Sequence, residues 1–99
     1  MITFVRTFSI MPGKTAEAVA FAHKIRKHAK DKHGMDMGLS MPIGGNPNRI
    51  AFVSTVGSLA EFEANMGKMM ADAEWQKMIV DNAANAIPGS VHDEMWRSL

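Results

Sequence analysis

The chain is predicted to fold as an α+β domain of the ferredoxin-like type, in which a βαββαβ succession builds a four-stranded antiparallel sheet. Two segments with helical spacing of apolar residues, 14–33 and 58–86, alternate with four strand candidates along the 99 residues. The first and third strand candidates, residues 2–10 and 50–56, are the most apolar, as expected at the centre of a sheet. The second and fourth are more polar and suit the edges, so the predicted strand order is 4-1-3-2 with right-handed crossovers.

Residues 2–10 are rich in β-branched and aromatic side chains and are predicted to form the first strand. Large side chains alternate with small ones along this segment, which places the two kinds on opposite faces. Pro12 and Gly13 end the strand, and residues 14–33 have a composition of Ala, Lys and Glu that favours a helix. Gly34 is the predicted C-terminal stop of that helix.

The two polar strand candidates are residues 35–43 and 90–97. Pro42 cannot donate a backbone hydrogen bond, so the first of them is expected at an edge of the sheet. Residues 44–48 contain two glycines, two asparagines and a proline, which predicts a turn and a hairpin to residues 50–56.

The region 58–86 begins with a capping box, in which Ser58 and Glu61 satisfy each other's backbone amides. Asp72 is predicted to cap a further segment that carries Trp75. The sequence leaves open whether this region is one helix or two.

Composition limits the classes of function. Apolar residues make up 46% of the chain and charged residues 21%, which is typical of a globular protein and predicts a single domain over residues 1–99. The absence of cysteine excludes disulfides and thiolate metal sites and fits a cytoplasmic location. No apolar run is long enough to cross a bilayer. The basic stretch at residues 24–32 lacks stacking aromatic side chains and is interrupted by Asp31, so neither a nucleic-acid nor a membrane partner is expected.

Two helices can cover only one face of a four-stranded sheet. The other face would expose apolar residues, and a soluble monomer seldom tolerates such a patch. A second copy of the chain would bury roughly 800 Å² on each subunit, which is the area of a standard stable interface. We therefore expect a homodimer through the sheet, although both faces of the central strands are apolar and the sequence does not decide which face meets the partner.

Three segments resemble one known family. Arg6-Thr-Phe-Ser-Ile-Met-Pro-Gly-Lys14 is similar to the opening strand and turn of NIPSNAP-like proteins of the dimeric α/β-barrel superfamily. Asp72-Ala-Glu-Trp-Gln76 resembles a segment of their second helical region, and Ser58-Leu-Ala-Glu61 resembles the turn before it. Phe8 stands where the family usually has tyrosine, and the chain has no tyrosine, so no role that needs a phenol is expected.

The resemblance implies a homodimer in which two sheets face each other as a barrel, with a small pocket between sheet and helices in each subunit. Relatives in the superfamily include cofactor-free monooxygenases, haem-degrading monooxygenases, isomerases and stress-response proteins, so the fold does not select a function. The predicted function is binding of a small apolar, oxygen-bearing compound, with cofactor-independent monooxygenase or isomerase chemistry as its catalytic form. The alternatives are a non-catalytic stress-response or interaction module and a haem-binding monooxygenase. No cofactor is expected for the first two.

Arg6 is the most unusual residue of the first strand because it stands among large apolar side chains. A buried guanidinium needs a partner, and the last strand is expected beside the first. Glu94 and His92 are therefore the predicted partners of Arg6. In the functional interpretation His92 acts as a general acid or base and Arg6 stabilises anionic charge. In the structural interpretation these residues form an ion pair at the sheet edge or in the dimer interface.

Trp75 and Trp96 are predicted to line an apolar ligand pocket together with Glu94, and the alternative is that they are core residues. His23, His28 and His33 suggest a metal site at first sight. Their five-residue spacing turns about 140° per step around a helix, so they are expected to diverge. We therefore predict that these histidines lie at the surface or are partly buried, and that they bind no metal.

Overall fold

The computed structural model describes residues 1–99 and confirms the predicted fold class, order of elements and strand order. The sheet has the order β2-β3-β1-β4, and all of its neighbouring strands are antiparallel. The elements are β1 (Ile2–Ser9), α1 (Thr15–His33), β2 (Gly38–Ser40), β3 (Arg49–Val56), α2 (Leu59–Met70), α3 (Ala73–Asp81), the short 3-10 helix η1 (Ala83–Asn85) and β4 (His92–Arg97).

The edge strand β2 is shorter than the predicted range 35–43, because only Gly38–Ser40 pairs with β3. The residues before it are held by the end of α1 instead. The Met35 amide donates to the Ala29 carbonyl at 3.1 Å, and Asp36 forms an ion pair with Lys30. After β2, Pro42 has no amide hydrogen to continue the ladder.

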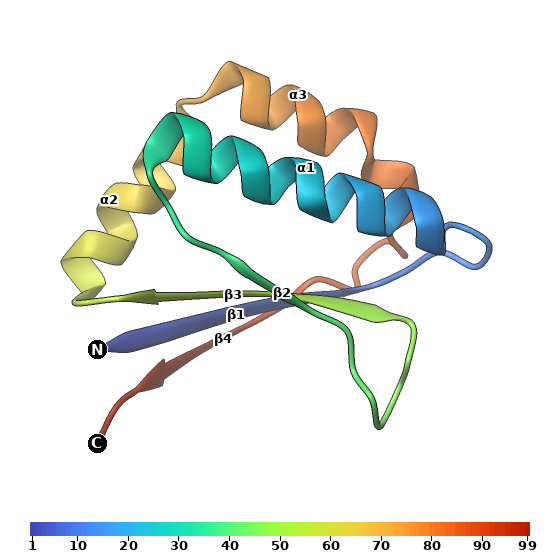
Figure 1. Ribbon diagram of the computed structural model, residues 1–99, viewed down its shortest axis with the longest axis horizontal. Coiled ribbons are helices and arrows are strands. Elements are labelled where there is room, and N and C mark those ends of the chain that lie inside the picture. The colour runs from blue at the N-terminus through green and yellow to red at the C-terminus, as the bar shows by residue number, and fades with distance from the viewer.

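All the helices lie on one face of the sheet, and the other face is bare (Figure 1). Side chains from alternate positions of β1 reach the helices. Phe8 packs into the core against α1, and the Phe4 ring lies 5.0 Å from the ring of Phe62 in α2. The intervening residues Thr3, Val5 and Thr7 therefore point to the bare face.

The core lies between the sheet and α1. Phe8, Ile10 and Ile50 of the sheet side pack against Ala18 and Ala22 of α1, and each of these is at most 7% exposed. Small alanine side chains allow the helix to approach the sheet closely. None of the helices combines the length and the apolar character that a bilayer crossing requires.

The region 58–86 is divided into two helices, and the division falls at Ala71 and Asp72. Ser58 caps α2 by accepting a hydrogen bond from the Glu61 amide at 3.2 Å, as predicted from the capping box. Asp72 caps α3 by accepting from the amides of Glu74 and Trp75, both at 3.1 Å. The question that the sequence left open is thus answered by a second cap that starts a new helix.

Candidate functional site

Arg6 is paired with Asp93, and the prediction that its partner is Glu94 or His92 is wrong. Arg6 Nε lies 2.7 Å from Asp93 Oδ1 and Nη2 lies 2.8 Å from Oδ2, a bidentate arrangement. Arg6 stands directly opposite Asp93 in the register of β1 and β4. A sequence does not fix register, and a change of one residue turns every side chain of β4 to the other face.

The pair lies at the surface. Both side chains are 40% exposed, and the guanidinium carbon of Arg6 stands 5.5 Å from the centre of the Phe4 ring. The hydrogen bond between the two side chains is the main cause that raises the pKa of Arg6 and lowers the pKa of Asp93. Both groups are therefore charged at neutral pH, and their charges are already satisfied by each other.

His92, Glu94 and Trp96 lie on the bare face of the sheet. They stand opposite Thr7, Val5 and Thr3 of β1, all of which point away from the helices. His92 Nε2 lies 3.5 Å from Glu94 Oε2, and both side chains are exposed. Within one chain, these three residues are thus separated by the sheet from Arg6, which faces the helices.

Trp75 is half-buried in α3, with its ring 6.2 Å from the ring of His28 in α1. The five predicted site residues therefore occupy three separate places in the chain: the helical side of the sheet, the bare side, and the contact between α1 and α3. They do not form one constellation, and their individual roles in binding or catalysis stay predictions.

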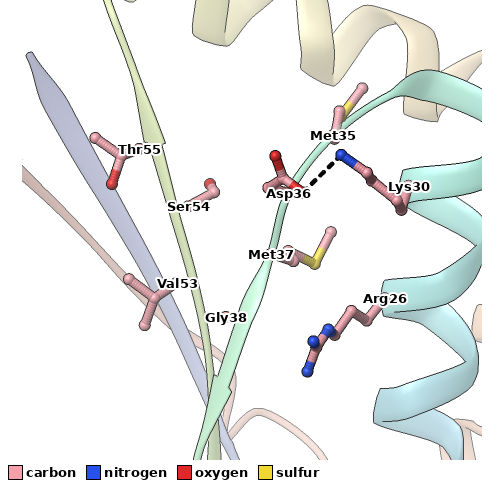
Figure 2. A pocket seen from close by; sticks show the side chains of 9 residues that line it. All are labelled: Arg26, Lys30, Met35, Asp36, Met37, Gly38, Val53, Ser54 and Thr55. Atoms are coloured by element: carbon pink, nitrogen blue, oxygen red, sulfur yellow. Dashed lines mark ion pairs between the residues drawn. The ribbon is translucent and has the colours of Figure 1, made fainter.

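The structure contains instead a cleft beside β2, which we call the Arg26 cleft (Figure 2). Its volume is about 580 Å³, within the range of small-molecule sites. It lies between the C-terminal half of α1, the segment that leads into β2, and β3. The lining residues are Arg26, Lys30, Met35, Asp36, Met37, Gly38, Val53, Ser54 and Thr55.

The cleft has an excess of positive charge. Lys30 Nζ is paired with Asp36 Oδ1 at 2.9 Å, as the dashed line in Figure 2 shows. Arg26 takes part in none of the ion pairs of the structure, and its side chain extends from α1 toward β2. A guanidinium without a protein partner beside methionine side chains is suited to an anionic group on an otherwise apolar molecule.

A second, smaller cleft of about 180 Å³ adjoins the first and shares Arg26 with it. It lies between α1 and the other end of β2, with mainly apolar walls that include Leu39 and Ile50, and it contains His23. One signal for this region is present in the sequence, namely the four-residue spacing of Arg26 and Lys30, which places both cations on one helical face. The cleft itself depends on the short length of β2, and this length was not predicted from the sequence.

A cluster of titratable side chains joins the end of α1 to the junction of α2 and α3. His28 Nε2 and His33 Nε2 lie 2.8 and 2.7 Å from the same oxygen of Asp72, Oδ2. The two histidine side chains are 11% and 12% exposed, and the Asp72 side chain is fully buried. We call these three residues the histidine–aspartate cluster.

The cluster corrects the expectation that the histidines diverge. The ring centres of His28 and His33 stand only 6.1 Å apart, because Asp72 lies over the end of α1 and both rings reach it. His23 is exposed and belongs to the smaller cleft. The hydrogen bond with His28 is the largest cause that holds the pKa of Asp72 well below its usual range, and burial acts in the opposite direction.

Comparison with known proteins gives the family. The sequence profile of the NIPSNAP family matches residues 3–95, nearly the whole chain. The chain belongs to the NIPSNAP family. No curated protein matches it.

Several solved structures share the fold of this NIPSNAP chain. An uncharacterized NIPSNAP domain protein from Burkholderia xenovorans has a TM-score of 0.85 at 16% identity, covering 100% of this chain and 95% of the other. Protein Atu4242 from Agrobacterium tumefaciens has a TM-score of 0.83 at 15% identity, with 100% and 94% covered. A putative antibiotic biosynthesis monooxygenase from Nitrosomonas europaea has a TM-score of 0.74 at 12% identity, with 100% and 99% covered. At these identities the likeness shows the ferredoxin-like fold alone.

Proposed function

We propose that this NIPSNAP protein binds a small anionic compound with an apolar body in the Arg26 cleft. The observation that carries the proposal is the unpaired guanidinium of Arg26 in a cleft of about 580 Å³. A bidentate contact with a carboxylate would satisfy this charge. Met35 and Met37 offer an adaptable apolar wall for the rest of the molecule.

Cofactor-independent oxygenase or isomerase chemistry is the catalytic form of this proposal. Support comes from solved neighbours with the same fold that are named putative antibiotic biosynthesis monooxygenases. The polar side chain of β3 nearest to such a ligand would be Ser54, while Thr55 and the predicted acid–base residue His92 point to the other side of the sheet. The cytoplasmic location expected from the sequence stays a prediction.

A homodimer is the second part of the proposal, with the bare face of the sheet as its interface. Only 12 of the 99 residues are buried in the isolated chain, and Trp96 on this face is 60% exposed. Val5, Ala51 and Val53 form an apolar centre on the same face, since they occupy neighbouring positions of β1 and β3 that point away from the helices. Covering this surface with a second copy would remove apolar area from water.

Titration with benzoate, a small aromatic carboxylate, tests the binding proposal. We expect saturable shifts of the Gly38, Ser54 and Thr55 amide signals in proton–nitrogen NMR spectra. Arg26→Met removes the charge and keeps an apolar side chain, and it should weaken binding about tenfold or more. Lys24→Met is the matched control, because Lys24 is an exposed cation of α1 outside both clefts. Equal affinity of the two variants, or no saturable shift in the unmodified protein, would contradict the proposal.

A further inference from the structure

The histidine–aspartate cluster is separate from the Arg26 cleft, and none of its residues lines that cleft. It connects α1 to the junction of α2 and α3, which lies beside the C-terminal end of α1 in Figure 1. The proposed binding function makes no use of it. The cluster places two nearly buried imidazoles on one fully buried carboxylate.

The three side chains offer a set of ligand atoms that suits a divalent metal ion. One ring nitrogen of His28, one of His33 and a carboxylate oxygen of Asp72 all lie within 4.8 Å of one another. In a tetrahedral zinc site with bonds of about 2.0–2.1 Å, ligand atoms stand about 3.3 Å apart. The observed separations of 2.8 and 2.7 Å between each Nε2 and Oδ2 thus need to widen by only about half an ångström. We propose that His28, His33 and Asp72 form a binding site for a divalent first-row transition metal ion of the Zn²⁺ class.

The two oxygens of Asp72 have different partners, and this division leaves one of them for a metal. Oδ1 accepts hydrogen bonds from the amides of Glu74 and Trp75 at 3.1 Å and from Lys32 Nζ at 3.0 Å. The two backbone amides, which are fixed by α3, hold the plane of the carboxylate. Oδ2 faces only the two imidazoles, which both approach the same atom. A cation placed between the imidazoles and Oδ2 would take the place of the two hydrogen bonds on this oxygen.

A small turn of the exposed Glu74 side chain would give His28 the outer support that histidine ligands usually have. Its Oε2 lies 3.8 Å from His28 Nδ1, the ring nitrogen on the side away from Asp72. When Nε2 of a neutral imidazole binds a metal, the proton is carried by Nδ1, and a carboxylate facing Nδ1 orients the ring and raises its basicity. The arrangement of metal, His28 and Glu74 would then have the form of a carboxylate–histidine–zinc triad.

Lys32 is the one group near this site that disfavours a bound cation, because it is itself positively charged. Its ammonium group contacts Oδ1, the oxygen away from the two imidazoles, and its side chain is 48% exposed, so the ammonium group can turn into solvent.

Three protein ligands leave a fourth position for water. A bound ion would hold α1 and the α2–α3 junction together, and saturation should raise Tm by on the order of 10 °C.

Zinc titration of the untagged protein tests the site directly. The chain has four histidines, so four ring Cε1–H signals are expected in the proton NMR spectrum. His23→Ala and His92→Ala assign two of these signals without touching the cluster. With the unmodified protein we expect the His28 and His33 signals to change together and to saturate at one equivalent of Zn²⁺. Absence of saturable binding, or equal changes in all four signals, would overturn the proposal.

Calorimetric titration of variants with Zn²⁺ gives a second, independent readout. His33→Ala and Asp72→Asn should lose measurable binding, and Asp72→Asn keeps an oxygen that can cap α3. Glu74→Gln should bind about tenfold more weakly. His23→Ala is the matched control, because it removes a histidine of the same helix outside the cluster. Unchanged affinity in His33→Ala and Asp72→Asn, or loss of affinity in His23→Ala, would overturn the site.

Discussion

The bidentate pair of Arg6 and Asp93 joins β1 to β4 at the surface of the molecule. The position of Arg6 among large apolar side chains predicted a paired guanidinium, and a pair is present. The partner is Asp93, one position from the predicted Glu94 and His92, because the register of β4 against β1 is set by backbone pairing that no local pattern in β4 specifies. The same one-residue error placed His92, Glu94 and Trp96 on the wrong side of the sheet.

The exposure of the Arg6–Asp93 pair determines its effect on stability. Arg6→Met keeps the apolar stem and removes the charge, and it should cost about 1 kcal/mol or less at pH 7, because both side chains are 40% exposed and solvent screens them. The pKa of Asp93 is lowered in the folded protein, so its contribution is present above the unfolded pKa of about 3.9 and is lost as the pH falls through the folded value. The cost of Arg6→Met should therefore shrink below about pH 4.

Urea unfolding of Arg6→Met and the unmodified chain between pH 7 and pH 2 measures this difference. A matched variant is Arg49→Met, an arginine of β3 that forms no ion pair in the structure and whose effect should not follow the titration of Asp93. A loss of more than about 3 kcal/mol for Arg6→Met would be the behaviour of a buried pair and would contradict the exposed geometry.

At the scale of elements, caps were easier to predict than contacts between elements. Ser58 and Asp72 were recognised from local sequence because a cap needs only a short side chain before a helical segment. The convergence of His28 and His33 was not recognised, because it depends on Asp72, about 40 residues away along the chain, reaching the end of α1. The length of β2 was overestimated for a similar reason, since the Lys30–Asp36 pair holds the preceding residues to α1.

Asp72 combines a local cap with a contact between helices, because its side chain caps α3 and also binds two histidines of α1. Asp72→Ala removes the acceptor for the Glu74 and Trp75 amides and for two histidines, and it should lower Tm by at least about 5 °C. Asp72→Asn should be clearly less destabilising, because asparagine is also a good cap. Thermal unfolding in the presence of a chelator keeps metal binding out of the comparison.

A useful control for this prediction is Asp81→Ala, which removes an exposed acidic residue at the other end of α3, paired only with Lys77. Its effect on Tm should be small, since an exposed pair of this kind contributes little. If Asp72→Ala were no more destabilising than Asp81→Ala, the carboxylate would not hold α3 to α1 in the way the distances indicate.

The fold of the whole molecule was more predictable than its individual contacts, because the sheet order follows from the polarity of whole strands. Apolar strands at 2–10 and 50–56 could only be central, and the two polar strands could only be edges. The sequence left the choice of sheet face open, and the helices decide it by covering the face of Phe4 and Phe8. The face of Val5 and Val53 is left bare.

A dimer through this bare face makes a prediction about unfolding. If two sheets bury each other, dissociation accompanies unfolding, and Tm should rise with protein concentration. Val5→Arg places a charge at the centre of the face and should give a monomer by light scattering, with far-ultraviolet circular dichroism retained. Ala20→Arg is the control, because Ala20 is exposed on α1 and lies away from the sheet. A concentration-independent Tm in an unmodified protein that light scattering shows to be monomeric would reject the dimer, and the exposed Trp96 would then need another partner.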